Sequence, residues 1–312
     1  MNGTVFLYSS HNRGHYLHDR FVAGRAVNGW ANKRLLFLPM SDGRGADSQA
    51  TQQLAWDNFR WFFDQYRHRG LEAFPFYWSP HLSRPDVDQL WHHLYHSEVV
   101  VLGGGHSLTG LERYKQLGAR FDGEWGKFGR ILHERQARGL LTVGFSAGAD
   151  QLGERLWRSL HVGEAYNDGF ALASNVMVTL HHEPSQASEL AWGARVYPRE
   201  RIFGLPNDSG LSIAQGRTPR GLHYQVIEFV IDNSWDDPSD AMHVKTREGV
   251  RIDHFYPDGR HWAFGGGEQM VRLRSDDFRF DESWIVAGGQ AVHYASHARD
   301  GYHNVEHLIS AH

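Results

Sequence analysis

The chain lacks cysteine altogether across its 312 residues. Without thiols it can form no disulfide, and it cannot hold zinc or an iron–sulfur cluster through cysteine ligands. The same absence excludes every thiol nucleophile. Any covalent catalysis by this chain must therefore use another side chain.

An excess of positive charge and long apolar runs are also lacking. Lys and Arg number 32 and Asp and Glu number 36, which leaves a formal charge of −4. This balance predicts no nucleic-acid partner, because phosphate binding needs a basic face. The longest apolar runs, such as 99–102, are far shorter than the about 20 residues that a membrane span needs. The N-terminus has no signal-peptide pattern, so the sequence predicts a cytoplasmic protein without membrane contact.

What the chain does contain is typical of a folded protein, with 41 % hydrophobic and 13 % aromatic residues. Short apolar runs alternate with longer amphipathic stretches over residues 4–158. This alternation predicts an α/β fold with a mostly parallel sheet and helices on both faces. The expected strands cover residues 5–8, 34–39, 71–78, 98–102 and 140–144, and the expected helices cover 49–68, 86–95, 108–117, 125–138 and 147–157.

The pattern becomes rich in β-strands after residue 168. A hairpin is expected around a turn at Pro257, Asp258 and Gly259. Because a single core stops growing at about 250–300 residues, the sequence predicts an α/β domain over 1–232 and a β-rich C-terminal extension over 233–312. The strands expected before the extension cover residues 171–180, 201–205, 210–214 and 222–232.

The sharpest motif is Gly-Phe-Ser-Ala-Gly at residues 144–148, between an expected strand and an expected helix. This is the G-x-S-x-G pattern of a nucleophile elbow, in which glycines permit a tight turn and the serine hydroxyl projects from it. The amide of Ala147 would lie at a helix N-terminus, where partial positive charge favours an oxyanion. The alternative is that Ser146 is the N-cap of an ordinary strand-to-helix turn.

A serine nucleophile needs a general base and a second oxyanion donor. Among 22 histidines, His181 and His182 follow the strand expected at 171–180, and they could face the elbow. The glycines at 103–105 follow another apolar strand and could direct a backbone amide at the oxyanion. The alternative for this turn is phosphate binding, but it lacks the later glycine of G-x-G-x-x-G and the G-K-[ST] of a P-loop.

Taken together, these motifs resemble the peptidase S51 family, which includes dipeptidase E and cyanophycinase. The resemblance rests on VVVLGGGHSLTGL, GLLTVGFSAGADQL, a histidine after the strand ALASNVMVTL, and IFGLPNDSGLSI, and it covers about residues 4–232. It implies a fold similar to class I glutamine amidotransferases, with serine in place of their cysteine. It also implies a serine peptidase that forms an acyl-enzyme without a metal or another cofactor.

The resemblance assigns roles to residues at matching positions. Ser146 would be the nucleophile, and the amides of Gly105 and Ala147 would form the oxyanion hole. His182 would be the general base, with His181 as the fallback. The third member of the triad would be Asp168, with Glu164 and Glu154 as less favoured candidates.

The family's substrates are Asp-containing peptides or cyanophycin, so the resemblance implies Asp-containing, isoaspartyl or cyanophycin-type peptides. An Asp carboxylate would need a cation near the site. The candidates downstream of the histidines are Arg199, Arg195 and Arg201. His106 replaces the residue that would contact substrate after the glycine turn, and Glu183 replaces the usual Phe after the catalytic histidine. The family is often dimeric, so a homodimer is an implication of the resemblance.

Two alternatives stay open at this point. An α/β-hydrolase-type esterase shares the elbow but would use a much later histidine, such as His254 or His293. A non-catalytic binding protein on the same fold would explain the departures at His106 and Glu183.

Overall fold

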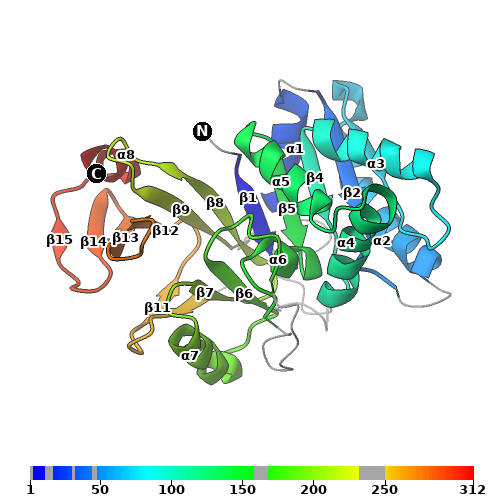
Figure 1. The fold of residues 1–312 in the computed structure, drawn as a ribbon. Helices are drawn as coiled ribbons and strands as arrows, with labels where there is room; N and C mark the ends of the chain where they lie inside the picture. Colours follow the sequence, from blue (N-terminus) through cyan, green and yellow to red (C-terminus); the bar gives the residue numbers. More distant parts are fainter. Residues whose placement is uncertain (1–2, 11–16, 30–31, 44–47, 158–167, 232–249) are drawn as a thin grey trace.

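The computed structural model describes residues 3–10, 17–29, 32–43, 48–157, 168–231 and 250–312. Two sheets organise these residues, one of eleven strands and one of four. The first strand of the chain lies in the interior of the large sheet, and the last strand forms one of its edges (Figure 1).

The N-terminal half of the large sheet is parallel, as the alternation of strands and helices predicts. Its order is β1-β5-β4-β2-β3, and each neighbouring pair runs in the same direction. Parallel neighbours need a crossover segment, and the amphipathic stretches supply it. The strands are β1 (Val5–Tyr8), β2 (Arg34–Leu38), β3 (Glu72–Pro75), β4 (Val99–Leu102) and β5 (Leu141–Phe145).

Helices cover both faces of this parallel half. Successive strand residues face opposite sides, so Val5 and Leu7 pack into one buried cluster while Phe6 and Tyr8 pack into another. The first cluster includes residues of α3 (Arg84–His96), α4 (Ser107–Asp122) and α5 (Lys127–Ala137), and the second includes residues of α1 (Leu17–Asn28) and α2 (Ser48–Asp64). The expected arrangement of helices on both faces is therefore confirmed for this half.

The other half of the large sheet is antiparallel, which corrects the expectation of a mostly parallel sheet. From β1 outward the order is β8-β9-β12-β13-β14-β15, and all these neighbours run in opposite directions. Several connections are short turns, which can join only antiparallel strands. The strands are β8 (Ser209–Arg217), β9 (His223–Ile231), β12 (Gln269–Arg274), β13 (Asp281–Ala287), β14 (Gln290–His293) and β15 (Arg299–Asp300).

The region expected as an extension is β-rich, and it continues the same sheets. Strand β12 pairs with β9, and α8 (Val305–Ala311) packs through Leu308 on the face of β12 that carries Val271 and Leu273. The hairpin expected at the Pro-Asp-Gly turn is present as β10 (Ile252–Phe255) and β11 (His261–Phe264).

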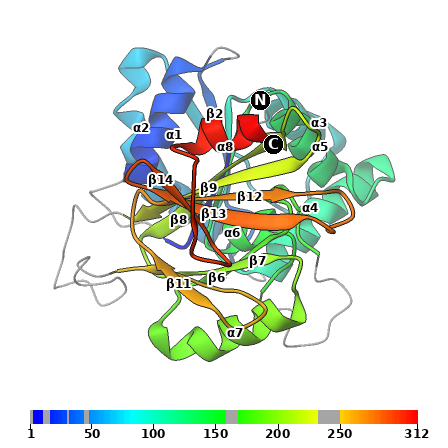
Figure 2. The same cartoon turned by 90° about the vertical axis from the view of Figure 1, so that its left-hand side faces the viewer.

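The four-stranded sheet has the order β11-β10-β7-β6. Its remaining strands are β6 (Val176–Leu180) and β7 (Arg201–Leu205), which are parallel and connected through η4 (Pro184–Gln186) and α7 (Ala187–Val196). Figure 2 shows this sheet and α7 on one side of the antiparallel half, with α8 on the other side. Buried residues of both sheets, including Phe203 and Phe229, share one cluster.

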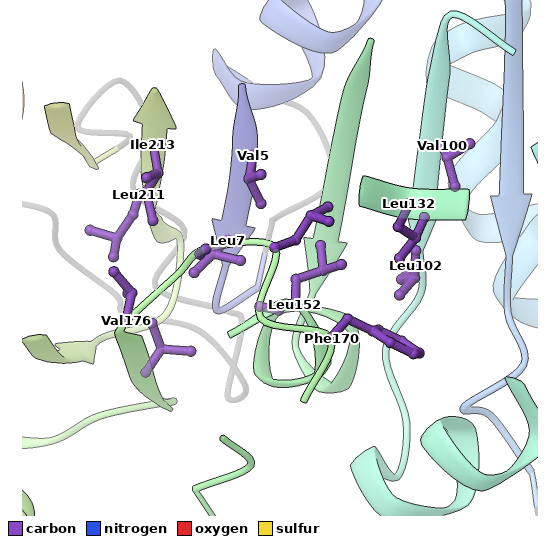
Figure 3. Packing of buried hydrophobic residues seen from close by; sticks show 14 of the residues in the cluster. Val5, Leu7, Val100, Leu102, Leu132, Leu152, Phe170, Val176, Leu211 and Ile213 are labelled. Carbon is purple, nitrogen blue, oxygen red and sulfur yellow. The ribbon is translucent and has the colours of Figure 1, made fainter. Parts of the chain in front are cut away.

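This shared core also fixes the short helix α6 (Ala147–Leu152), which follows β5. Leu152 of α6, Val176 of β6 and Leu7 of β1 belong to the same buried cluster (Figure 3). The end of β5 leads directly into this helix, and β6 packs against it. Residues that follow these two strands are brought together at that place.

Candidate active site

Ser146 lies in a strained turn between β5 and α6. Its backbone has a φ of 49°, in the left-handed region that costs a non-glycine residue about 1–2 kcal/mol. The surrounding turn is tight, because a Cβ at Gly148 would lie 2.2 Å from the carbonyl oxygen of Leu102. The Ser146 side chain makes no capping hydrogen bond to α6. The serine is therefore not an ordinary N-cap, and its hydroxyl is half-buried at a cavity.

His181 is the histidine within reach of this serine. Its Nε2 lies 3.3 Å from Ser146 Oγ, and its Nδ1 lies 2.5 Å from Asn207 Oδ1. A carbonyl-type oxygen can only accept, so this pairing assigns the proton to Nδ1 and leaves Nε2 as an acceptor. A neutral imidazole in this tautomer can accept the hydroxyl proton of Ser146.

The backbone of His181 is also held in an unusual state. Its φ is 55°, and its amide donates a 2.8 Å hydrogen bond to Ser9 Oγ after β1. Ser10 Oγ donates to Asn207 Oδ1 at 3.2 Å. The segment after β1 thus supports both the base and its orienting partner.

Asn207 was not among the residues predicted for the site. It follows β7 within the motif IFGLPNDSGLSI, which was the available signal. A carboxylate, and not an amide, was the expected third member. An amide oxygen can orient the imidazole in the same way, although it adds no negative charge.

The structure corrects the expectation that His182 faces the serine. The His182 ring has other partners: its Nδ1 lies 3.2 Å from Thr179 Oγ1, and its Nε2 lies 3.2 Å from Asp253 Oδ2. Beyond the end of β6 the chain takes a left-handed turn, with a φ of 55° at residue 181, and only one of the two adjacent histidines reaches the elbow. That residue is His181, the fallback.

Asp168 is likewise not beside the histidine. Its side chain is 77 % exposed and forms an ion pair with Arg155 at 2.7 Å. Glu154 accepts a hydrogen bond from the amide of Asn175 and lines a different groove. Glu164 lies outside the described residues.

The two expected oxyanion donors lie beside Ser146. Ala147 is the first residue of α6, so its amide has no acceptor one turn earlier in the helix. Gly105 has a φ of 127°, and a Cβ there would lie 2.2 Å from the Ser41 carbonyl oxygen. A Cβ on the adjacent Gly104 would lie 3.5 Å from Ser146 Cβ, which places the glycine turn against the serine.

A cavity of about 500 Å³ opens beside these groups. His106 lines it from the N-cap of α4, where Nδ1 accepts a 3.3 Å hydrogen bond from the amide of Thr109. The ionisable lining also includes Asp150 and Glu189. The described lining consists of Gly105, His106, Ser107, Leu108, Ser146, Ala147, Asp150, Leu156, Trp157, Val178, Thr179, Leu180, His181, Gln186 and Glu189.

The arginines expected to bind an acidic substrate lie elsewhere. Arg199 is exposed, and its guanidinium lies 5.1 Å from the centre of the Phe278 ring. Arg201 is buried in an ion pair with Asp281, and Arg195 is exposed on α7. In the described part of the chain, no Lys or Arg lines the cavity. The expected role of Arg199 in substrate binding is therefore corrected.

Two side chains of β10, Asp253 and His254, have shifted pKa values. Burial alone would raise the pKa of the Asp253 carboxyl, but hydrogen bonds from His182 and His261 outweigh it and lower that pKa. Burial, together with nearby Arg201, lowers the pKa of His254 to about 3. His254 is thus neutral at physiological pH, with Nδ1 lying 2.9 Å from the Ile202 carbonyl oxygen.

The later histidines of the esterase alternative are not at the elbow. His254 is 1 % exposed within the small sheet, and His293 pairs with Glu282 at 2.7 Å on β14. Over the described ranges, no group of three or more His, Asp or Glu side chains is arranged to hold a metal. No described helix combines the length and the apolar character that crossing a membrane requires.

Comparison with known proteins gives a fold likeness. No family model matches the chain, and no curated protein matches it. Among solved structures it is similar to the crystal structure of a peptidase from an acI-B1 Actinobacterium, with a TM-score of 0.56 and 16 % identity. The match covers 86 % of this chain and 96 % of that chain. At this identity the likeness shows a shared fold.

Proposed function

We propose that this protein is a serine peptidase that cleaves peptide bonds through an acyl-enzyme. The observation that carries the proposal is the 3.3 Å approach of His181 Nε2 to Ser146 Oγ at a strained turn. The fold likeness to a peptidase supports the same reaction class. Membership of the S51 family, with its amidotransferase-like fold, is part of the proposal and rests on the motif resemblance.

In the first half of the reaction, Ser146 Oγ attacks the carbonyl carbon of a peptide bond while His181 Nε2 takes the hydroxyl proton. Negative charge develops on the carbonyl oxygen, and the amides of Gly105 and Ala147 donate to it. Each such donor typically lowers the barrier by about 3 kcal/mol. His181 then returns the proton to the nitrogen as the carbon–nitrogen bond breaks, which releases the amine.

In the second half, water attacks the acyl-enzyme with His181 again as the base. The ester bond to Ser146 breaks, Oγ regains its proton from His181, and the acid product leaves. Asn207 keeps His181 in the productive tautomer throughout. Because an amide cannot offset the charge of the imidazolium, the site depends on orientation more than on charge pairing.

The cavity lining does not favour the substrate class that the family resemblance implies. Asp-containing, isoaspartyl and cyanophycin-type peptides are expected from the resemblance, yet the arginines that would bind an Asp carboxylate lie away from the cavity. The described lining carries Asp150 and Glu189 instead. We therefore propose a peptide substrate without a preference for acidic side chains, and acidic peptides belong in the test panel.

The decisive experiment is labelling with a fluorophosphonate probe, followed by a peptide panel. The wild type should form a covalent adduct on Ser146 and hydrolyse at least one dipeptide class, and Ser146→Ala should do neither. Ser185→Ala is the matched control, since Ser185 is exposed on η4 and does not line the cavity. An unlabelled, folded wild type would favour the binding-protein alternative.

Two further proposals follow from the sequence. A homodimer is implied by the resemblance, and sedimentation velocity tests it. A cytoplasmic location is also proposed, and fractionation of the source cells tests it.

A further inference from the structure

An imidazole–carboxylate pair lies at the residue that follows the proposed base. His182 Nε2 is 3.2 Å from Asp253 Oδ2, and the other carboxylate oxygen, Oδ1, is 2.9 Å from His261 Nε2. On its other side, His182 Nδ1 is 3.2 Å from Thr179 Oγ1. The mechanism uses none of these four groups, although His182 adjoins His181 in the chain.

His182 is fixed far more firmly than its neighbour. Its side chain is 2 % exposed, whereas His181 is exposed at the cavity. The His182 amide donates a 2.9 Å hydrogen bond to the Leu205 carbonyl oxygen. The ring also covers Gly204 so closely that a Cβ there would lie 2.5 Å from His182 Cδ2.

This firmness matters because the preceding residue is strained. His181 has a φ of 55°, and such a conformation persists only where the surrounding structure holds it in place. The Ser9 hydroxyl holds the amide on one side of His181. On the other side, the restraint comes from the buried ring of His182 and its bond to Asp253.

We propose that the Asp253–His182 pair is a positioning device that holds His181 in line with Ser146. The pair acts through the backbone, so His182 and Asp253 are positioning residues and touch no substrate. The proposal rests on the proposed function, because it assigns His181 as the base.

The same pair gives the C-terminal part of the chain a role in the reaction. Asp253 belongs to β10, which pairs with β7 through His254 and Phe203. That strand lies beyond the region in which motifs resemble the S51 family. The small sheet therefore carries a support for the base that those motifs do not contain.

A double-mutant cycle tests the proposal. Asp253→Leu and His182→Leu each remove the bond from one end, and each should lower kcat and the rate of fluorophosphonate labelling about 10-fold, since a displacement of about 1 Å can cost up to about 100-fold. KM should stay within about 2-fold, since neither residue lines the cavity. The double variant should lose no more than either single variant, because one shared bond is removed.

Rescue and control variants separate positioning from general damage. Asp253→Asn keeps an acceptor oxygen for His182 and should recover most of the lost rate. Asp258→Asn changes an aspartate in the turn of the same hairpin, where its partner is Arg260, and should leave kcat unchanged. Where a single leucine variant fails to fold, the double variant carries the test, since replacing both partners leaves neither end of the 182–253 bond buried and unpaired.

The outcomes distinguish the two proposals. A wild type that the probe does not label overturns the proposed function. A labelled wild type, with a folded double variant that reacts at the wild-type rate, overturns the positioning role and leaves the peptidase proposal intact. If the kcat losses of the two single variants multiply in the double variant, the two residues act independently, and this also contradicts the proposed role of the bond between them.

Discussion

Two adjacent histidines follow β6, and their surroundings differ: one faces the cavity, and the other is buried. On the cavity side, His181 is exposed, contacts Ser146 and pairs with the neutral amide of Asn207. On the buried side, His182 pairs with the carboxylate of Asp253 and lies against Gly204. The carboxylate that usually marks a catalytic histidine is thus on the wrong side for catalysis.

This contrast shows that pairing with an acid does not by itself identify a general base. Access to the nucleophile and a free acceptor nitrogen decide the role. The strained backbone is on the cavity side, at both Ser146 and His181. Strain of this kind is typical of functional sites, and here it distinguishes the reactive side from the supporting side.

The largest expected effect comes from removing the imidazole on the cavity side. His181→Ala should lower kcat on the order of 10⁴-fold or more, because no other described group takes the Ser146 proton. His182→Leu should retain about a tenth of the wild-type kcat. Steady-state kinetics on one peptide, with folding checked by circular dichroism, gives both values. Equal losses of kcat in the two variants would contradict the assignment of His181, and not His182, as the base.

The next effect concerns the neutral partner of His181. Asn207→Ala should lower kcat on the order of 10²-fold, because the imidazole loses the acceptor that fixes its tautomer. Asn207→Asp should keep the orientation but favour the protonated ring, which cannot act as a base. The acid limb of its pH–rate profile should therefore move to higher pH. A profile that does not move would contradict the contact between residues 207 and 181.

The free energy of unfolding should depend on pH through His254, a buried histidine of the small sheet. The pKa of His254 is lowered by burial to about 3, so in acid the unfolded chain binds a proton that the folded chain does not. As pH falls below the ordinary histidine pKa of about 6.5, the free energy of unfolding should therefore fall by up to about 1.4 kcal/mol per pH unit because of this group. The loss should be absent above that pH.

His254→Phe isolates this contribution, because the ring still packs near Phe203 but cannot titrate. The free energy of unfolding, measured with urea at pH 7 and at pH 5, should drop less between these two pH values for the variant than for the wild type. The difference between the two drops should approach about 2 kcal/mol. Identical drops would mean that His254 is protonated in the folded state.

Local sequence signals predicted the parts of the fold and site that depend on neighbours in the chain. The elbow at Ser146, the glycine turn at Gly105 and the Pro-Asp-Gly hairpin each follow from steric needs of a few consecutive residues. The alternation of strands and helices likewise predicted β1 to β5. These features need no knowledge of distant contacts.

Other features depend on contacts between segments far apart in sequence. The antiparallel half joins the parallel half where β8 pairs with β1, and no local pattern carries that pairing. The choice between His181 and His182 depends on the left-handed turn at the strand end. Asn207 was missed because its partner lies after a different strand, and because a carboxylate was expected in its place.

The smallest expected effect tests the charge of the cavity side. Glu189→Lys reverses an exposed charge in the cavity lining, and exposed pairs contribute about 0.2–1 kcal/mol. The ratio of kcat/KM for Asp-containing over Lys-containing peptides should rise about 5-fold, and the rise should shrink at high salt. Glu183→Lys is the matched control, because Glu183 is exposed but does not line the cavity. An unchanged ratio, or an equal rise in the control, would mean that Glu189 does not face the substrate. The surroundings of His181 would then differ from those of His182 only in being open to substrate, and not in a charge that selects it.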